Sequence, residues 1–454
     1  MSIKGYSKQK YKTQMNEYLS ASGPLRSAQH LMGRENEMEL IDEALSANDR
    51  HIFIFGDRGV GKTSLAAAAA TQYLPDNSEF IQIGCGPDTK FYKTIEDLAD
   101  RVIKKASGKR NYSATQTINV KFYSIKWNKE NHEIAIPNVD SMYLAVEAIE
   151  EVARFHTYTP VVIFDEFDQI DSQNERRLFA NFLKDLGDRG VNIKLIFTGV
   201  AQSLIKLLGE HESSFRQLHT VELKRLYWGA REDIVRQAVD SFSLTIDKEV
   251  VFTIAKISNG FPYFVHLLTE KILWCAFNAE VEIKNIGFPL FSEALEKAIS
   301  TISAHLQAPY DKATQHRKND YREILWATAD SESTIRYIDG MFKSYLRINE
   351  QLYGANPDGA NRPLTRAKFT SRLGNLKKTE YGAILENASD RKGIYSYREN
   401  ILRGYVAMKA LELGIELQGD IPDEPKKPTA LGKQTRQFAA GRDFTPKVKF
   451  RGEE

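Results

Sequence analysis

The chain has 454 residues, 42% of them hydrophobic and 27% charged, and its 62 basic and 60 acidic residues give a formal net charge of +2. This composition suits two or three domains with apolar cores and excludes a uniformly basic nucleic-acid-binding surface, although not a local basic patch. Two cysteines, Cys85 and Cys275, exclude a disulfide framework. Because no signal peptide and no run of roughly 18 apolar residues is present, we expect a cytoplasmic protein that does not contact a membrane.

Residues 1–30 are polar and basic without a sustained period, which predicts an extended arm. Short apolar strands then alternate with helices over residues 31–228, as in a parallel sheet covered on both faces. We expect strands at 51–55, 80–84, 160–164, 193–197 and 220–226, with helices at 31–45, 63–73, 90–106, 141–155 and 175–186. An alternating stretch at 115–139 predicts an inserted β-hairpin. The fold class is therefore α/β.

The second half of the chain is mainly helical in pattern. Residues 229–305 predict a small helical domain, and residues 306–415 predict a third unit. In that unit we expect helices at 320–329, 335–345 and 364–376 and a strand pair at 382–385 and 394–397. Residues 416–454, rich in Pro, Lys, Gln and Gly, predict a disordered basic tail.

The strongest motif is Gly56-Asp57-Arg58-Gly59-Val60-Gly61-Lys62-Thr63, a full GxxxxGK[ST] loop between a predicted strand and a predicted helix. Its glycines let backbone N–H groups converge on phosphates, and the following helix N-terminus adds positive partial charge. Lys62 is expected to reach the β- and γ-phosphates, and the Thr63 hydroxyl to hold Mg²⁺. Ser64 is expected to be a further nucleotide-binding residue. The alternative is a glycine turn with a solvated lysine. We therefore predict ATP and Mg²⁺ as ligands.

The second motif is Pro160-Val161-Val162-Ile163-Phe164-Asp165-Glu166, an apolar strand that ends in two carboxylates. Ligands of open α/β sheets bind at this end of the strands. Asp165 is expected to order the Mg²⁺ shell, and Glu166 to polarise the attacking water. An acidic pair alone is usually a solvated turn, and for Asp168 and Asp171 a charged helix start is the preferred interpretation.

Two further residues are candidates for the same reaction. Thr198 ends the strand predicted at 193–197, where its hydroxyl can touch the γ-phosphate or the water; the alternative is a cap of the next helix. An arginine from a neighbouring subunit often stabilises charge on the transferring phosphoryl group. Arg216 is the candidate and Arg225 the reserve, against the alternative of an ordinary surface arginine. This role requires a homo-oligomer.

Together these motifs resemble AAA+-type P-loop ATPases, in particular origin-recognition-like (initiator-type) ATPases and the related STAND signalling ATPases. The resemblance covers roughly residues 25–410 and begins at Leu31-Met32-Gly33-Arg34-Glu35, which is similar to a motif that lies against the nucleotide base in those families. It implies that Gly33 and Arg34 are adenine-side residues. It also implies a P-loop domain followed by a helical lid and a winged helix.

The predicted lid departs from the initiator pattern. Its stretch Ser258-Asn259-Gly260-Phe261-Pro262-Tyr263 has no arginine of the sensor 2 type and resembles the GxP motif of STAND and archaeal-type ATPases. The resemblance implies that Pro262 lies near the nucleotide and couples its state to the lid angle. Alternatively, Gly260 and Pro262 only separate two helices. The missing arginine favours a slow switch.

The third unit resembles the winged-helix domain of origin-recognition-like ATPases, with residues 365–373 as the recognition helix. Leu364, Phe369, Leu373 and Leu376 are expected to face the core, and Arg366, Lys368, Arg372 and Lys377 to point outward. Arg391 and Lys392 would lie at the tip of the wing. Residues 361–409 hold eleven Lys and Arg against four Asp and Glu, a local excess of +7. This implies contact with double-stranded DNA, although winged helices also bind proteins.

The sequence therefore predicts an ATP-hydrolysing AAA+/STAND-like protein that assembles on DNA, in initiation, transposition or mobile-element biology. The alternative is a nucleotide-gated signalling switch that recruits a protein effector, for example in phage defence. A remodelling chaperone is a weaker possibility, because no aromatic pore loop supports it.

Overall fold

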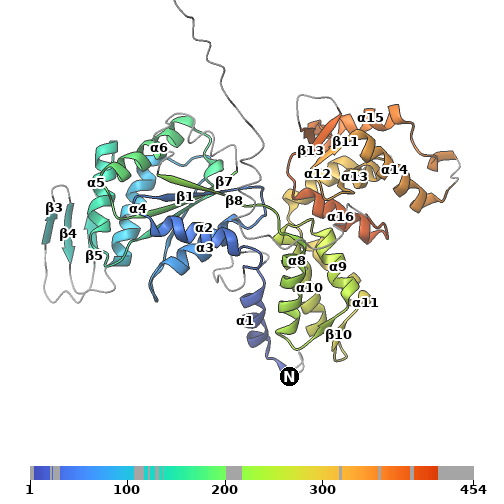
Figure 1. The fold of residues 1–454 in the computed structure, drawn as a ribbon, viewed down its shortest axis with the longest axis horizontal. Helices are drawn as coiled ribbons and strands as arrows, with labels where there is room; N and C mark the ends of the chain where they lie inside the picture. The colour runs from blue at the N-terminus through green and yellow to red at the C-terminus, as the bar shows by residue number, and fades with distance from the viewer. Residues whose placement is uncertain are drawn as a thin grey trace, which may run out of the picture.

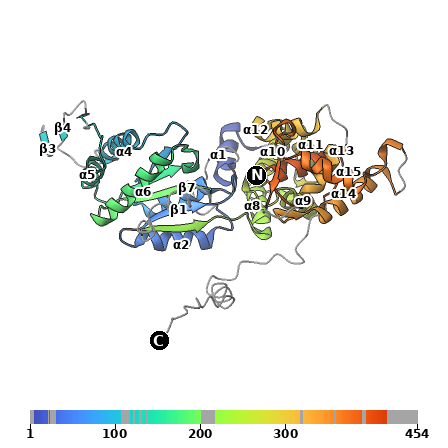
Figure 2. The same cartoon turned by 90° about the horizontal axis from the view of Figure 1, so that it is seen from above.

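The computed structural model describes residues 5–20, 23, 31–106, 117–120, 123–127, 132–135, 138–200, 217–315, 320–355, 359–388 and 393–417. An α/β domain occupies one end of the molecule, and a helical domain and a C-terminal unit lie together at the other (Figures 1 and 2). The predicted tail lies outside the described residues beyond Leu417. None of the helices in the described ranges has the length and apolarity to cross a membrane.

The α/β domain is built on a five-stranded sheet of order β2-β6-β7-β1-β8 in which every strand pair is parallel. Its strands are β1 (His51–Phe55), β2 (Ile81–Gly84), β6 (Val161–Asp165), β7 (Lys194–Gly199) and β8 (Leu218–Glu222). The predicted α/β fold class is thereby confirmed. β8 begins two residues before the predicted strand and ends at Glu222.

Helices cover both faces of this sheet, which explains why its strands are apolar throughout. The helices are α2 (Glu35–Ser46), α3 (Lys62–Tyr73), α4 (Phe91–Ala106), α5 (Met142–Ala153) and α6 (Gln173–Asp188). Alternate side chains of β1 point to opposite faces of the sheet. Ile52 and Ile54 pack with α2 and α3 on one face, and Phe53 packs with α4 to α6 on the other. All five residues of β6 are buried, so this central strand places its last residue, Asp165, with little freedom.

The inserted sheet has three antiparallel strands rather than the two of the predicted hairpin. They are β3 (Thr117–Val120), β4 (Tyr123–Trp127) and β5 (His132–Ala135), in the order β3-β4-β5. The alternating stretch from 118 to 127 holds two strands, because it is long enough to turn back on itself. The insertion lies at the end of the α/β domain far from the helical domain (Figure 1).

The helical domain follows the sheet. It comprises α8 (Trp228–Asp240), α9 (Lys248–Ile257), α10 (Pro262–Asn278) and α11 (Phe288–Thr301), with a short parallel pair β9 (Thr245–Ile246) and β10 (Asn285–Ile286). α10 carries ten buried residues over its length, because it packs against both α8 and α11. It is thus the central helix of this domain.

The N-terminal arm is not extended as predicted, because Lys8–Tyr18 form helix α1. Ser7 caps the helix by accepting a hydrogen bond from the backbone N–H of Lys10 at 3.3 Å. Tyr11 is fully buried against the helical domain, where its ring stacks on Phe277 with a centroid distance of 4.3 Å. Two buried residues four apart, Tyr11 and Met15, define the apolar face, too sparse a pattern to stand out among polar neighbours.

The C-terminal unit combines five helices with a three-stranded antiparallel sheet of order β11-β13-β12 among its described residues. Its elements are α12 (Ala304–Thr314), α13 (Asp320–Ala329), β11 (Ile335–Tyr337), α14 (Ile338–Tyr353), α15 (Arg366–Asn375), β12 (Leu385–Asn387), β13 (Ile394–Tyr397) and α16 (Leu402–Glu412). β11 adds a third strand to the predicted pair. α16 packs against α13 of its own unit and against α11 of the helical domain, which joins the two bodies.

Candidate functional site

The glycine-rich loop lies between the end of β1 and the start of α3. Gly61 caps α3 with φ of 97°, a left-handed conformation that favours glycine. A Cβ on Gly56 would lie 2.2 Å from the carbonyl oxygen of Leu223, so a side chain has no room there. These two glycines set a tight turn that directs the first N–H groups of α3 into the space above the loop.

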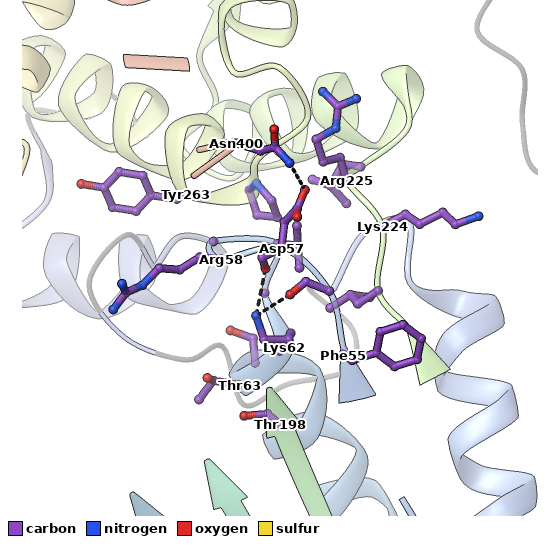
Figure 3. Close-up of a pocket in the computed structure, with 18 of the residues that line it drawn as sticks. Phe55, Asp57, Arg58, Lys62, Thr63, Thr198, Lys224, Arg225, Tyr263 and Asn400 are labelled. Atoms are coloured by element: carbon purple, nitrogen blue, oxygen red, sulfur yellow. Dashed lines mark hydrogen bonds between the residues drawn. The ribbon is translucent and has the colours of Figure 1, made fainter. Parts of the chain in front are cut away.

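A cavity of about 1070 Å³ lies over this loop. It is lined by every residue from Gly56 to Ser64 and also by the predicted site residues Arg34, Asp165, Glu166, Thr198 and Pro262. Figure 3 shows the labelled side chains converging on it from the α/β domain, the helical domain and the C-terminal unit. The volume suits a ligand of nucleotide size.

Lys62 lies at the base of the cavity. Its Nζ donates to the carbonyl oxygens of Asp57 at 2.8 Å and Gly56 at 3.1 Å, as the dashed lines in Figure 3 show. Burial lowers the pKa of Lys62 below its ordinary value, and the nearby carboxylates of Asp168, Asp57 and Asp165 oppose that shift. Asp168 lies in the first turn of a short 3-10 helix, as a charged helix start does, and it also lines the cavity.

Asp165 is the centre of a hydrogen-bond cluster at the carboxyl ends of three strands. Its Oδ1 accepts from the hydroxyl of Thr63 at 2.9 Å and from that of Thr198. Its Oδ2 accepts from Nε2 of Gln82 at 3.0 Å. The parallel sheet thus brings together the predicted metal residues and Thr198. Gln82 was not predicted as a site residue. The feature of the sequence that could have indicated it is a polar side chain within the apolar strand β2.

Glu166 follows in an unusual backbone conformation, with φ of 56° and ψ of 41°. Its N–H donates to Oγ1 of Thr198 at 3.1 Å, while its side chain is exposed at the cavity. A left-handed conformation is unfavourable for glutamate, and such conformations cluster at functional sites because the surrounding structure enforces them. The carboxylate is thereby free to contact a ligand while its backbone is held.

Replacing Thr198 by valine is expected to lower ATP hydrolysis about 10-fold, because two hydrogen bonds of about 0.5–1.5 kcal/mol each are lost, one to Asp165 Oδ1 and one from the Glu166 N–H. ATP binding should stay within about twofold of wild type, since the phosphate cradle is untouched. Steady-state ATPase assays and calorimetric titration measure the two effects. The control is Thr71→Val, whose hydroxyl bonds only the Ala67 carbonyl one helical turn back. Equal rates in both variants would contradict this role.

The two predicted adenine-side residues have different surroundings. Arg34 is only 4% exposed and donates from Nη2 to the carbonyl oxygen of Val60 at 2.9 Å, so it braces the glycine-rich loop from the side. Gly33 packs against α8 instead, where a Cβ would lie 2.5 Å from that of Ala230. Its φ of 72° permits this close approach. Arg34 therefore lines the cavity, and Gly33 supports it from behind.

The helical domain reaches the loop through Pro262. This proline occupies the first turn of α10, where its missing N–H costs nothing. Its Cγ lies 3.9 Å from the position of a Cβ on Gly61. The N-terminus of α10 therefore stands directly over the start of α3, as the GxP resemblance implies.

The C-terminal unit contacts the same loop, which sequence reasoning missed. Nδ2 of Asn400 donates to Oδ2 of Asp57 at 3.0 Å (Figure 3). The side chain of Ile401 covers Gly59, where a Cβ would lie 2.4 Å from its Cδ1. Nothing in the local pattern around Asn400 indicates a partner 343 residues away.

The arginine candidates divide between described and undescribed residues. Arg216 lies outside the described residues. Arg225, the reserve, donates to the carbonyl oxygens of Asn259 at 2.9 Å and Glu332 at 2.8 Å in its own chain. It therefore joins the α/β domain to the other two bodies at the edge of its own cavity.

The proposed DNA-contact residues also differ from one another. Lys368 is exposed on α15, and Lys377 donates to Oδ1 of Asn387 at 3.1 Å. Arg366 bonds the carbonyl of Ile338 at 3.0 Å and pairs with Asp339. Arg372 does not point outward as predicted, because it faces α13 and pairs with Asp320 over the ring of Tyr321. Arg391 and Lys392 lie outside the described residues.

The expected core face of α15 is largely as predicted. Phe369, Leu373 and Leu376 are fully buried, and Leu364 is partly buried against them. The helix is thus anchored by one face and exposes Lys368 on the other.

Comparison with known proteins defines the class of this site. The family model of the AAA ATPase domain matches residues 30–196, which contain the glycine-rich loop, Asp165 and Glu166. This part of the chain is therefore similar to the AAA ATPase domain, and its parallel sheet has the P-loop fold. A search of curated proteins gave no match.

Solved structures are similar to this chain at low sequence identity. The Walker-type ATPase PABY2304 of Pyrococcus abyssi is similar with a TM-score of 0.50 and 17% identity, covering 85% of this chain and 98% of that one. Cdc6p from Pyrobaculum aerophilum gives a TM-score of 0.44 and 14% identity over 87% of this chain and 98% of its own. ORC1 of Aeropyrum pernix, solved in complex with DNA, gives a TM-score of 0.41 and 12% identity, covering 85% of this chain and 94% of its own.

Proposed function

We propose that this protein binds ATP with Mg²⁺ in the described cavity and hydrolyses it slowly as a conformational switch. The observation that carries the proposal is the hydrogen-bonded set of Thr63, Asp165 and Thr198 next to Lys62 at the mouth of the P-loop. A hydroxyl and a carboxylate oxygen 2.9 Å apart are hard oxygen donors of the kind that Mg²⁺ prefers, so these residues fit the metal.

Each residue has a defined task in this proposal. The loop N–H groups and Lys62 bind the phosphates, and Thr63 with Asp165 would hold the metal. Bound Mg²⁺ supplies positive charge that neutralises the phosphate oxygens. Glu166 accepts a hydrogen bond from the attacking water and orients it, while Thr198 keeps the Glu166 backbone in position. Arg216 would act on the site of a neighbouring protomer in a homo-oligomer.

We further propose that ATP-bound protomers assemble on duplex DNA through the C-terminal unit, which would act as a winged helix. Support comes from α15, anchored by Phe369 and Leu373 and exposing Lys368, and from the three-stranded sheet, of which β12 and β13 follow that helix. The excess of seven positive charges over residues 361–409 suits contact with phosphates. Possible settings are initiation, transposition and mobile-element biology.

The test measures the ATPase rate and the oligomeric mass of the full chain with and without duplex DNA. Hydrolysis stimulated by DNA, together with an ATP-dependent increase in mass on the duplex, is the expected result. Hydrolysis that is indifferent to DNA, in a chain that stays monomeric on it, would contradict the assembly while leaving the ATPase proposal intact.

Replacing Lys368 by glutamine is expected to weaken duplex binding uniformly across sequences and to reduce the slope of log affinity against log salt by about 1, because one phosphate contact is lost. Fluorescence anisotropy over a series of salt concentrations measures both. The matched control is Lys248→Gln, an exposed lysine on α9 of the helical domain. An unchanged salt slope for Lys368→Gln would show that α15 does not face DNA.

A second candidate function is a signalling switch that recruits a protein effector. The contacts of Asn400 and Ile401 with the P-loop favour it, because they link the nucleotide site directly to the C-terminal unit. Arg231 strengthens the same junction by pairing with Glu332 at 2.9 Å. In this version nucleotide exchange releases the unit to bind its partner. Slow hydrolysis that ignores DNA, with assembly only when an effector is added, is its expected signature.

A further inference from the structure

His266 is a buried polar residue in the nucleotide cavity that the mechanism above does not use. It lies on α10, lines the cavity and is 5% exposed. Within the residues that the structure describes, its Nδ1 is buried and has no hydrogen-bond partner. Native proteins rarely leave such an atom unpaired, because the lost hydrogen bonds to water are not replaced. His266 thus has hydrogen-bonding capacity that the described residues do not use, in a side chain that lines the nucleotide cavity.

The position of His266 relative to the loop defines which part of a ligand it can meet. Pro262 stands over Gly61 at the phosphate end of the cavity. His266 follows four residues later on the same face of α10, about one helical turn or 5–6 Å away. A group that extends from the phosphates along α10 therefore passes in front of His266.

Apolar side chains of α8 and of the segment before α2 also line the cavity. Ile234 on α8 lines the cavity, and α8 packs directly against α10. The segment that contains Met32 runs along α8, because Gly33 packs on Ala230 and Nε2 of Gln237 lies 3.3 Å from Sδ of Met32. Arg34, Arg231 and Tyr263 add polar groups to the same lining, and a cavity that combines apolar side chains with a few polar groups suits a flat aromatic ligand.

We propose that His266 hydrogen-bonds the nucleobase of the bound nucleotide and is a specificity-determining residue of this site. The inference rests on the proposed nucleotide-binding function and adds the residue that reads the base. Burial lowers the pKa of His266 to about 4, so its imidazole is neutral near pH 7. A neutral imidazole is a donor at one nitrogen and an acceptor at the other, so whichever nitrogen meets the base can form one hydrogen bond with a polar atom on its edge.

The experiment compares two ligands on the full chain: a non-hydrolysable ATP analogue and inorganic tripolyphosphate, which has the phosphates without the nucleoside. For His266→Leu we expect about 10-fold weaker binding of the analogue and unchanged binding of tripolyphosphate, because only the base contact is lost. His266→Gln, which keeps a donor and an acceptor, should bind the analogue within about threefold of wild type. Calorimetric titration of wild type and the two variants with both ligands measures all six constants.

Thr269→Val is the matched control, since Thr269 is buried on the same helix and bonds only the Val265 carbonyl. Undiminished binding of the analogue by His266→Leu, or an equal loss for both ligands, would overturn the inference. If His266→Leu fails to fold, His266→Gln provides the test. In that variant, a loss of affinity for the analogue as large as the loss for tripolyphosphate would show that His266 has a structural role. Failure of the proposed function is distinct: wild type would bind neither ligand.

Discussion

Replacing Lys62 by alanine is expected to weaken ATP binding by at least about 100-fold. Two charge-assisted hydrogen bonds to phosphate, each about 1.5–3 kcal/mol, are lost together. The loop should keep its shape, because Gly61 and the Arg34 contact with Val60 hold it independently of Lys62. Calorimetric titration with a non-hydrolysable ATP analogue measures the loss.

Folding of this variant is expected to be intact. Burial lowers the pKa of Lys62, which means that the charged lysine is costly to bury and that its removal relieves this cost. Lys104→Ala, which removes an exposed lysine paired with Asp100, is the control for the change in net charge. An affinity within about fivefold of wild type for Lys62→Ala would show that phosphates do not bind at this loop.

Replacing Glu166 by glutamine is expected to reduce hydrolysis by about 10²–10⁴-fold while ATP binding is retained. Glutamine has the same shape, and the backbone N–H of residue 166 still bonds Thr198, so only the basic carboxylate is lost. The variant should therefore accumulate as an ATP-bound oligomer. Single-turnover assays measure the rate, and mass measurements with ATP measure the assembly.

The control for Glu166→Gln is Asp171→Asn, which neutralises an exposed carboxylate a short distance further along the chain. Its rate should equal that of wild type. A rate for Glu166→Gln within about fivefold of the control would assign the water-orienting role to another group.

The parts of the site that the sequence predicted are those that local pattern and sheet geometry determine. The glycine-rich loop is contiguous, so its shape follows from its own residues. Asp165 and Thr198 lie far apart in sequence but end neighbouring parallel strands, and the carboxyl ends of such strands meet at one edge. Their contact through Asp165 Oδ1 is therefore a consequence of strand order.

The features that were not predicted from the sequence depend on packing between elements that are distant in the chain. Asn400 and Ile401 reach the loop because α16 packs on the helical domain, and no local pattern encodes that arrangement. His266 sits in an apolar helix where a single histidine usually belongs to the core. Arg372 points inward because Asp320 lies opposite it on α13. Helical periodicity cannot predict an ion pair with a residue that is distant in the sequence.

Helix α1 is synthesised well before the helices of the helical domain against which it packs. The domain is assembled from two pieces, and the hydrogen bond from Gln14 to the carbonyl of Ser241 joins residues 227 apart. At about 5–20 residues per second, Tyr11 leaves the ribosome roughly 13–53 s before Phe277, its stacking partner on α10. Throughout that interval Tyr11 and Met15 have no aromatic surface to cover them. Newly made chains therefore present this face to chaperones until α10 arrives to bury it.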